Sequence, residues 1–198
     1  MTTASKQSAP GHDGKAGASS RRGNAQATKA NIIAAARKRF ATLSYDAVSL
    51  RAIAGDAGIN ASLVLRYFRS KDELFAAAIG DLLNPDALIS GPRETLGRRL
   101  AERTLAGRGM EESFTPILLM LCAARSAEAQ AIVQGQTARN FTGPFATWLG
   151  GDNAETRAHM IAAMVAGTIV QLSMAPPPIF TDIYADMLAD AVQKIVDG

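Results

Sequence analysis

The chain has 198 residues, enough for one or two domains, and its 47% hydrophobic and 20% charged residues are typical of a globular protein. Its single cysteine, Cys122, excludes an internal disulfide, and no group of cysteines and histidines has the spacing of a zinc site. No apolar run reaches the roughly 18–20 residues of a membrane span and no secretory signal is present, so we expect a soluble, cytoplasmic protein with no membrane partner, metal or cofactor.

Helix should dominate the fold. Alanine, the strongest helix former, supplies 38 of the 198 residues, and valine and isoleucine do not fall into short alternating runs. We therefore predict an all-α protein.

Charge is divided unevenly along the chain. Residues 21–75 carry ten Lys or Arg and four Asp or Glu, a net charge of +6, whereas residues 76–198 carry nine and thirteen, a net charge of −4. This asymmetry is typical of a protein that binds a polyanion at one end. An uneven surface without functional meaning is the alternative.

The first 24 residues are rich in Ser, Gly, Lys, Ala and Thr, with no periodicity and no large apolar residue after Met1. This composition predicts a disordered basic arm over residues 1–24. Its cations are either a weak electrostatic tether for DNA or part of a solvated tail.

Four helices are predicted next. The first covers about residues 27–43, with Ile33 and Phe40 on one apolar stripe. The second begins after the cap residue Ser49 and stops at Gly58, and the third begins near Asn60. The fourth begins with the capping box of residues 70–73 and ends at residues 84–85.

Five further helices complete the prediction, separated by glycine and proline breakers. The dipeptide Gly143-Pro144 should kink or break the third of them. The five predicted ranges are 93–106, 111–125, 127–149, 154–175 and 180–196.

The second and third helices form a helix-turn-helix pattern around Gly58. Val64 and Phe68 lie four residues apart and should anchor the third helix, which leaves its other face free to enter a DNA major groove. The residues expected to meet the groove are Ala61, Ser62, Leu65 and Arg66. Those expected at the flanking phosphates are Ser49, Tyr67 and Lys71.

Residues 28–77 resemble the DNA-binding domain of the tetracycline-repressor (TetR) family of bacterial regulators. Several motifs occur in order at the spacing of the family. They are residues 32–36, 40–41, 45–54, 57–59, 67–68 and 70–75. The resemblance implies a helix-turn-helix domain over residues 25–75, followed by a helical effector-binding and dimerisation domain over residues 76–198.

The resemblance also implies roles at matched positions: backbone and base contacts for Ser49 and Arg51, and phosphate contacts for Tyr67 and Lys71. The alternatives are a solvated charge at Arg51 or Arg66, and packing for Leu65 or Tyr67. Two departures stand out. Ser44 replaces a frequent glycine, and Leu65-Arg66 replaces a frequent aromatic pair, so the operator preferences of the family are not carried over.

In the C-terminal part, the resemblance implies dimerisation and ligand binding. Apolar spacing on the last two predicted helices suggests a four-helix interface, with internal core as the alternative. The interface candidates are Ile161, Val165, Thr168, Leu172, Ile183, Met187 and Ile195. An apolar pocket, or else plain core, is predicted at Leu118, Leu121, Phe141, Phe145 and Trp148. Gln134, Arg139 and Asn140 are candidate polar groups beside it.

The function that these patterns favour is a homodimeric repressor, released from a palindromic DNA operator by a small apolar or aromatic ligand. A transcriptional activator or an effector-independent regulator of the same family is the alternative. We expect no enzyme, because no catalytic or nucleotide-binding motif is found. An architectural DNA binder would show weak sequence preference.

Overall fold

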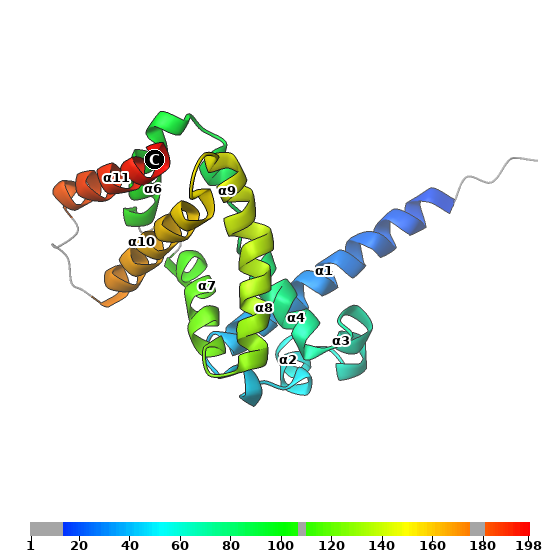
Figure 1. Cartoon of the computed structure of the whole chain (residues 1–198). Coiled ribbons are helices and arrows are strands. Elements are labelled where there is room, and N and C mark those ends of the chain that lie inside the picture. The colour runs from blue at the N-terminus through cyan, green and yellow to red at the C-terminus, as the bar shows by residue number, and fades with distance from the viewer. Residues whose placement is uncertain (1–13, 107–109, 175–180) are drawn as a thin grey trace, which may run out of the picture.

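The computed structural model of the chain describes residues 14–106, 110–174 and 181–198 (Figure 1). These residues form helices and no strand, which confirms the predicted all-α fold. None of their helices is both long and apolar enough to cross a membrane. In chain order the elements are α1 (Gly14–Phe40), η1 (Tyr45–Ala47), α2 (Leu50–Asp56), α3 (Ala61–Tyr67), α4 (Lys71–Gly80), α5 (Asp86–Ile89), η2 (Arg93–Thr95), α6 (Leu96–Leu105), α7 (Met110–Ala123), α8 (Ala127–Thr137), η3 (Ala138–Thr142), α9 (Gly143–Leu149), α10 (Ala154–Met174) and α11 (Asp182–Asp197).

Helix α1 begins at Gly14, well before the predicted start near residue 27. Residues 14–24, predicted to be disordered, are therefore helical, while residues 1–13 lie outside the described residues. Residues 14–24 have no apolar stripe, but they also contain no proline that would interrupt a helix. Once the packed half of α1 is formed, each further residue adds one backbone hydrogen bond without a new nucleation step, so the helix can extend.

The N-terminal core is built around three aromatic rings. Phe40, Tyr45 and Phe75 are almost completely buried, and their ring centroids lie 4.8–5.8 Å apart. The same apolar cluster includes Leu119 and Ala123 of α7 and Ala129 of α8. The DNA-binding domain predicted from the sequence is thus packed directly against the helices that follow it.

The ends of the short helices follow the predicted capping signals. Ser49 Oγ accepts a hydrogen bond from the backbone N–H of Ala52 (3.2 Å), and Ser70 Oγ accepts one from that of Glu73 (3.1 Å). The Glu73 carboxylate accepts from the N–H of Arg69 (2.8 Å), which completes the box one residue earlier than expected. Gly58 has a φ of +66°, the left-handed conformation that ends α2 and turns the chain into α3.

Ser44 has φ −59° and ψ 149°, which is not left-handed. The serine that stands where the TetR family often has glycine is therefore not strained.

A second core forms around α6 and α11. It includes Leu100 of α6 and Val192 and Val196 of α11. Gly97 permits this packing, because a Cβ at that position would lie 2.2 Å from the carbonyl oxygen of Ala189. Helices α9 and α10 cover the same core, at the opposite end of the molecule from α2 and α3 (Figure 1).

The predicted break at Gly143-Pro144 is present. Helix α8 passes into a π-helical turn, η3, before α9 begins at Gly143. Proline has no N–H to donate to the preceding turn, so the backbone widens there instead of continuing as a regular α-helix. A Cβ on Gly143 would lie 2.5 Å from the carbonyl oxygen of Ala138, so the widened turn leaves no room for a side chain.

Candidate nucleic-acid interface

Helix α3 has one face in the core and one face in solvent. Val64 and the cap residue Phe68 are almost completely buried, as predicted. On the opposite face, Ser62 and Arg66 are exposed and the Leu65 side chain is 50% accessible. Half of the Leu65 side chain is therefore accessible for contact with another molecule.

The remaining α3 candidates lie at the edges of this face. Ala61 and Tyr67 are half-buried. Tyr67 also packs against the N-terminal core, so the ring combines a core contact with an accessible edge. The position of Tyr67 is therefore compatible with both alternatives, a phosphate contact and packing on the core.

Helix α2 presents two candidates at its first turn. Ser49 and Arg51 are both exposed, and the Ser49 hydroxyl already accepts the cap bond of α2. The hydroxyl proton remains available to a phosphate oxygen, because the cap uses the serine only as an acceptor. Among the described residues, the ion pairs involve neither Arg51 nor Arg66.

Lys71 is held inside the domain more firmly than the sequence suggested. Its Nζ donates to the carbonyl oxygen of Tyr45 (3.2 Å) and lies 4.1 Å from the centroid of the Tyr45 ring. Sequence spacing did not reveal this contact, because the two residues are far apart in the chain. The ammonium group has three donors, so one can still be offered to a phosphate at the N-terminus of α4.

Tyr45 is fixed from a second side. Its hydroxyl hydrogen-bonds the carboxylate of Asp72, and burial together with this carboxylate raises the pKa of Tyr45 above its ordinary value. The phenol therefore stays protonated at neutral pH. Tyr45 connects the loop between α1 and α2 to the first turn of α4.

A further ion pair joins α1 to α2. Arg39 Nη2 lies 2.8 Å from Asp56 Oδ1, and this partner raises the pKa of Arg39 and lowers that of Asp56. The pair is exposed, so its contribution to stability is small. Its effect on the surface is to neutralise one cation beside the helix-turn-helix.

Comparison with known families identifies the chain. Residues 94–198, more than half of it, match the model described as "Tetracyclin repressor-like, C-terminal domain". Residues 32–78 match the model described as "Bacterial regulatory proteins, tetR family". The chain belongs to the TetR family. It is a transcriptional regulator of that family, and the resemblance found in the sequence is confirmed.

Solved structures of regulators share this fold. NalD of Pseudomonas aeruginosa, the secondary repressor of the MexAB-OprM multidrug efflux pump, is 19% identical, with a TM-score of 0.65 over 86% of this chain and 96% of NalD. The TetR-family regulator SCO0857 of Streptomyces coelicolor is 29% identical, with a TM-score of 0.55 over 86% and 95% of the two chains. A regulator from Rhodococcus is 22% identical, with a TM-score of 0.53 over 85% and 94%. The comparison with curated proteins gave no match.

The three aromatic residues proposed for a ligand pocket are brought together in this TetR-family regulator, whereas the structure of the described residues shows no contact between them and the two leucines proposed with them. Phe145 lies 5.9 Å, between ring centroids, from both Phe141 and Trp148. Phe145 is completely buried in the second core, where it serves as packing. Leu118 is half-buried on α7, and Leu121 is 59% exposed because it follows the buried Leu119 by two residues, about 200° around the helix.

An open groove of about 790 Å³ lies elsewhere in the regulator, between the end of α4 and the turn from α8 into η3. Asp81, Gln136, Arg139 and Asn140 contribute to its lining. Two of these were candidate polar groups, whereas none of the five predicted apolar residues lines this groove. A Cβ on Gly80 would lie 2.8 Å from Gln136 Oε1, so Gly80 leaves room for the end of this side chain beside the groove.

The apolar stripe predicted as the dimer face of α10 points largely inward. Ile161 and Thr168 are buried in the protomer, and the Thr168 hydroxyl lies 3.2 Å from the Tyr184 hydroxyl of α11. This corrects the prediction for these two residues. Val165, Leu172 and Ile195 are half-buried.

The apolar side chains that do face solvent lie on a neighbouring stripe. Met160 and Met174 of α10 are exposed, with Ala163 and Gly167 exposed between them. On α11, Ile183 and Met187 are 71% and 69% exposed, as an interface would require. We call Met160, Ala163, Gly167, Met174, Ile183 and Met187 the exposed apolar face.

Proposed function

We propose that this regulator is a homodimeric repressor that binds a palindromic operator and is released by a small molecule. The observation that carries the proposal is the division of α3 into a buried anchor face and an exposed face. A recognition helix needs both, because the anchors set its angle while the exposed side chains meet base edges.

The expected contacts follow from side-chain chemistry. Arg51 and Arg66 can bind guanine edges or phosphates, and Leu65 can pack on a thymine methyl group. Ala61 and Ser62 are small enough to let the helix approach the groove closely. Ser49, Tyr67 and Lys71 flank this set and would fix its register on the phosphates.

Dimerisation is supported by the exposed apolar face. Six exposed residues, four of them large and apolar, form this face on the last two helices, where two copies can build a four-helix bundle. Ala163 and Gly167 would allow the two copies of α10 to approach closely. A two-fold arrangement of protomers requires a palindromic site, since the symmetry of the protein is mirrored in its operator.

Effector response is supported by the position of the open groove. Arg37 of α1 donates through Nε to the carbonyl oxygen of Ala78 (2.8 Å), and its Nη2 lies 3.4 Å from Asp81 Oδ2. Asp81 is also part of the groove lining, so this ion pair connects the groove to α1. A small molecule in the groove would favour the position of α4 to which it binds more tightly. If that position does not bind DNA, the ligand would shift the protein away from the DNA-binding state by the difference in its affinity for the two states.

The proposal is tested by selecting bound sequences from a random double-stranded DNA library at near-physiological salt. Enrichment of one palindrome is the expected result and gives a probe for effector screening. Binding without enrichment would contradict sequence-specific recognition and favour an architectural DNA binder.

A further inference from the structure

The open groove lies where the chain passes between the two cores. Leu83 is buried in the N-terminal core and Leu88 packs against the second core, so residues 84–87 cross from one to the other. The chain makes the same crossing again at η3, where Phe141 packs against both cores and the column of α8 and α9 spans the molecule (Figure 1). Both crossings contribute residues to the groove, so a ligand there would contact the segments that join the cores.

Half of the residues that line the groove have polar side chains. They are Asp81, Asn84, Asp86, Gln136, Arg139 and Asn140. An apolar molecule would remove water from these groups without replacing their hydrogen bonds, which is unfavourable. The groove is therefore better matched to a polar ligand than to the apolar or aromatic ligand expected from the sequence.

Three amide side chains can hydrogen-bond a ligand in the groove. Gln136 Oε1 accepts from Asn140 Nδ2 (2.9 Å), and Asn84 Oδ1 accepts from the backbone N–H of Asp86 (2.8 Å). Among the described residues, these bonds leave the amide nitrogens of Gln136 and Asn84 as donors and the amide oxygen of Asn140 as an acceptor. The lining can thus both donate to a ligand and accept from it.

Opposite charges line the two sides of the groove. Arg139 Nε donates to the carbonyl oxygen of Gly135 (3.1 Å), which leaves the terminal nitrogens of the guanidinium available. Asp86 is exposed in the first turn of α5. The ion pairs of the described residues include neither of these two, whereas Asp81 Oδ2 lies 3.4 Å from Arg37 Nη2. One cation and one anion in the groove therefore lack a charged partner.

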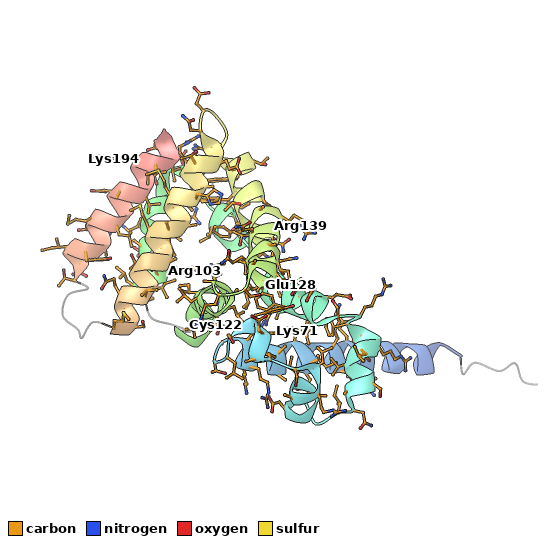
Figure 2. All side chains as sticks on the ribbon, turned by 60° about the horizontal axis from the view of Figure 1, so that its bottom comes forward. Lys71, Arg103, Cys122, Glu128, Arg139 and Lys194 are labelled. Carbon is orange, nitrogen blue, oxygen red and sulfur yellow. The ribbon has the colours of Figure 1, made fainter. Side chains whose placement is uncertain are left out.

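The segment that carries Arg139 has an unusual backbone. It is the π-helical turn η3, and π-helical turns are rare and are frequently found at functional sites. Arg139 lies on the side of the α8–α9 column that faces away from α10 and α11 (Figure 2). Its guanidinium is thus separate from the exposed apolar face.

We propose that this groove is the effector site and that its ligand is an α-amino acid, whose carboxylate binds Arg139 and whose ammonium group binds Asp86. The inference rests on the proposed effector response and names the chemistry of the ligand. A simple anion would be repelled by Asp86 and a simple cation by Arg139, whereas a zwitterion pairs with both. By joining Asp86 to Arg139, the ligand would tie the two crossings together and favour one placement of the cores.

Titration calorimetry of the full chain with each common L-amino acid tests the proposal in the absence of DNA. At least one of them should bind with a Kd below about 1 mM. The amide of that amino acid lacks the negative charge and its N-acetyl form lacks the positive charge, so each should bind about tenfold more weakly or worse. If none of the amino acids binds, the proposal is overturned.

Two substitutions test which residue binds which end of the ligand. Arg139→Gln should remove the preference for the amino acid over its amide and keep the preference over the N-acetyl form, and Asp86→Asn should do the reverse. Arg103→Gln is the control, because it removes an exposed cation of α6 that lies well apart from Arg139 (Figure 2), and it should keep both preferences. Equal weakening of all three ligands by either test substitution would indicate a structural effect and contradict the assigned contacts.

Operator binding separates this inference from the function on which it rests. The amino acid that binds should weaken operator binding by the unaltered protein and have less effect on Arg139→Gln. If it binds with the expected preferences but leaves operator affinity unchanged, the effector role fails. If the protein binds an operator and only molecules of another class release it, the proposed function stands and the amino-acid site is refuted.

Discussion

Lys71 makes a contact inside the domain and also lies at the edge of the helix-turn-helix formed by α2 and α3. Its ammonium group is bonded to the carbonyl oxygen of Tyr45 and lies over the ring of the same residue. Arg51 is exposed, and the described ion pairs do not include it. Removing these two cations should therefore have different consequences.

We predict that Arg51→Ala and Lys71→Ala both weaken operator binding, and that only Arg51→Ala relaxes base preference. Loss of a base contact costs about 1–3 kcal/mol at one position of the site, whereas loss of a phosphate contact is uniform across sequences. Library selection with each variant checks the division, and an equal loss on all sequences for both would refute it.

Lys71→Ala should also lower the free energy of unfolding by about 1 kcal/mol, because a hydrogen bond and a cation–π contact are lost. Arg125→Ala is the control, since this exposed arginine lies between α7 and α8 and its removal should change stability by less than about 0.5 kcal/mol. Thermal unfolding of the three proteins gives the comparison. Equal melting temperatures for the unaltered protein and Lys71→Ala would show that the Tyr45 contact has no stabilising effect.

At the scale of elements, close approach of α6 to α11 depends on one glycine. The position that a Cβ on Gly97 would occupy is blocked by the backbone of α11, which cannot rotate away as a side chain can. Gly55 on α2 is also helical, but its Cβ would meet nothing within 4 Å. The two glycines thus form a matched pair for mutation.

Gly97→Ala should destabilise the protein by about 1–3 kcal/mol, because the two helices must separate to admit the methyl group. Gly55→Ala should instead stabilise it by about 0.5–1 kcal/mol, since alanine loses less entropy in a helix. Urea unfolding measures both. A neutral Gly97→Ala would contradict the close packing of α6 and α11.

At the scale of the whole molecule, the exposed apolar face lies on α10 and α11, at the end away from α2 and α3 (Figure 1). A pairing of two chains through this face would leave both copies of α3 free for DNA. The face is therefore the surface on which the proposed dimer depends.

We predict that Ile183→Asp with Met187→Asp converts the dimer to monomer, because burying two carboxylates in an apolar interface is strongly unfavourable. Both side chains are largely exposed in the protomer, so the fold should survive. Sedimentation measures the mass of the protein in solution. Operator affinity should fall when the dimer is lost. Leu121→Asp is the control, as an exposed apolar residue outside this face. A double variant that remains dimeric would place the interface elsewhere.

Much of the N-terminal organisation follows from the sequence, since it depends on local rules. The hydroxyls of Ser49 and Ser70 cap the helices they precede, Gly58 takes the left-handed turn, and Val64 and Phe68 are buried at their four-residue spacing. Each of these outcomes depends on backbone groups or positions within one or two helical turns, so neighbouring residues are enough to predict it.

Other features were decided by partners distant in the chain. Helix α10 has two stripes of apolar or small residues, and only its packing on α6, α9 and α11 shows that Ile161 and Thr168 face inward while Met160 and Met174 face solvent. Lys71 meets Tyr45 because η1 and α4 are brought together by a shared aromatic core. Periodicity predicts which residues share a face of a helix, but tertiary contacts decide which of two apolar faces is buried.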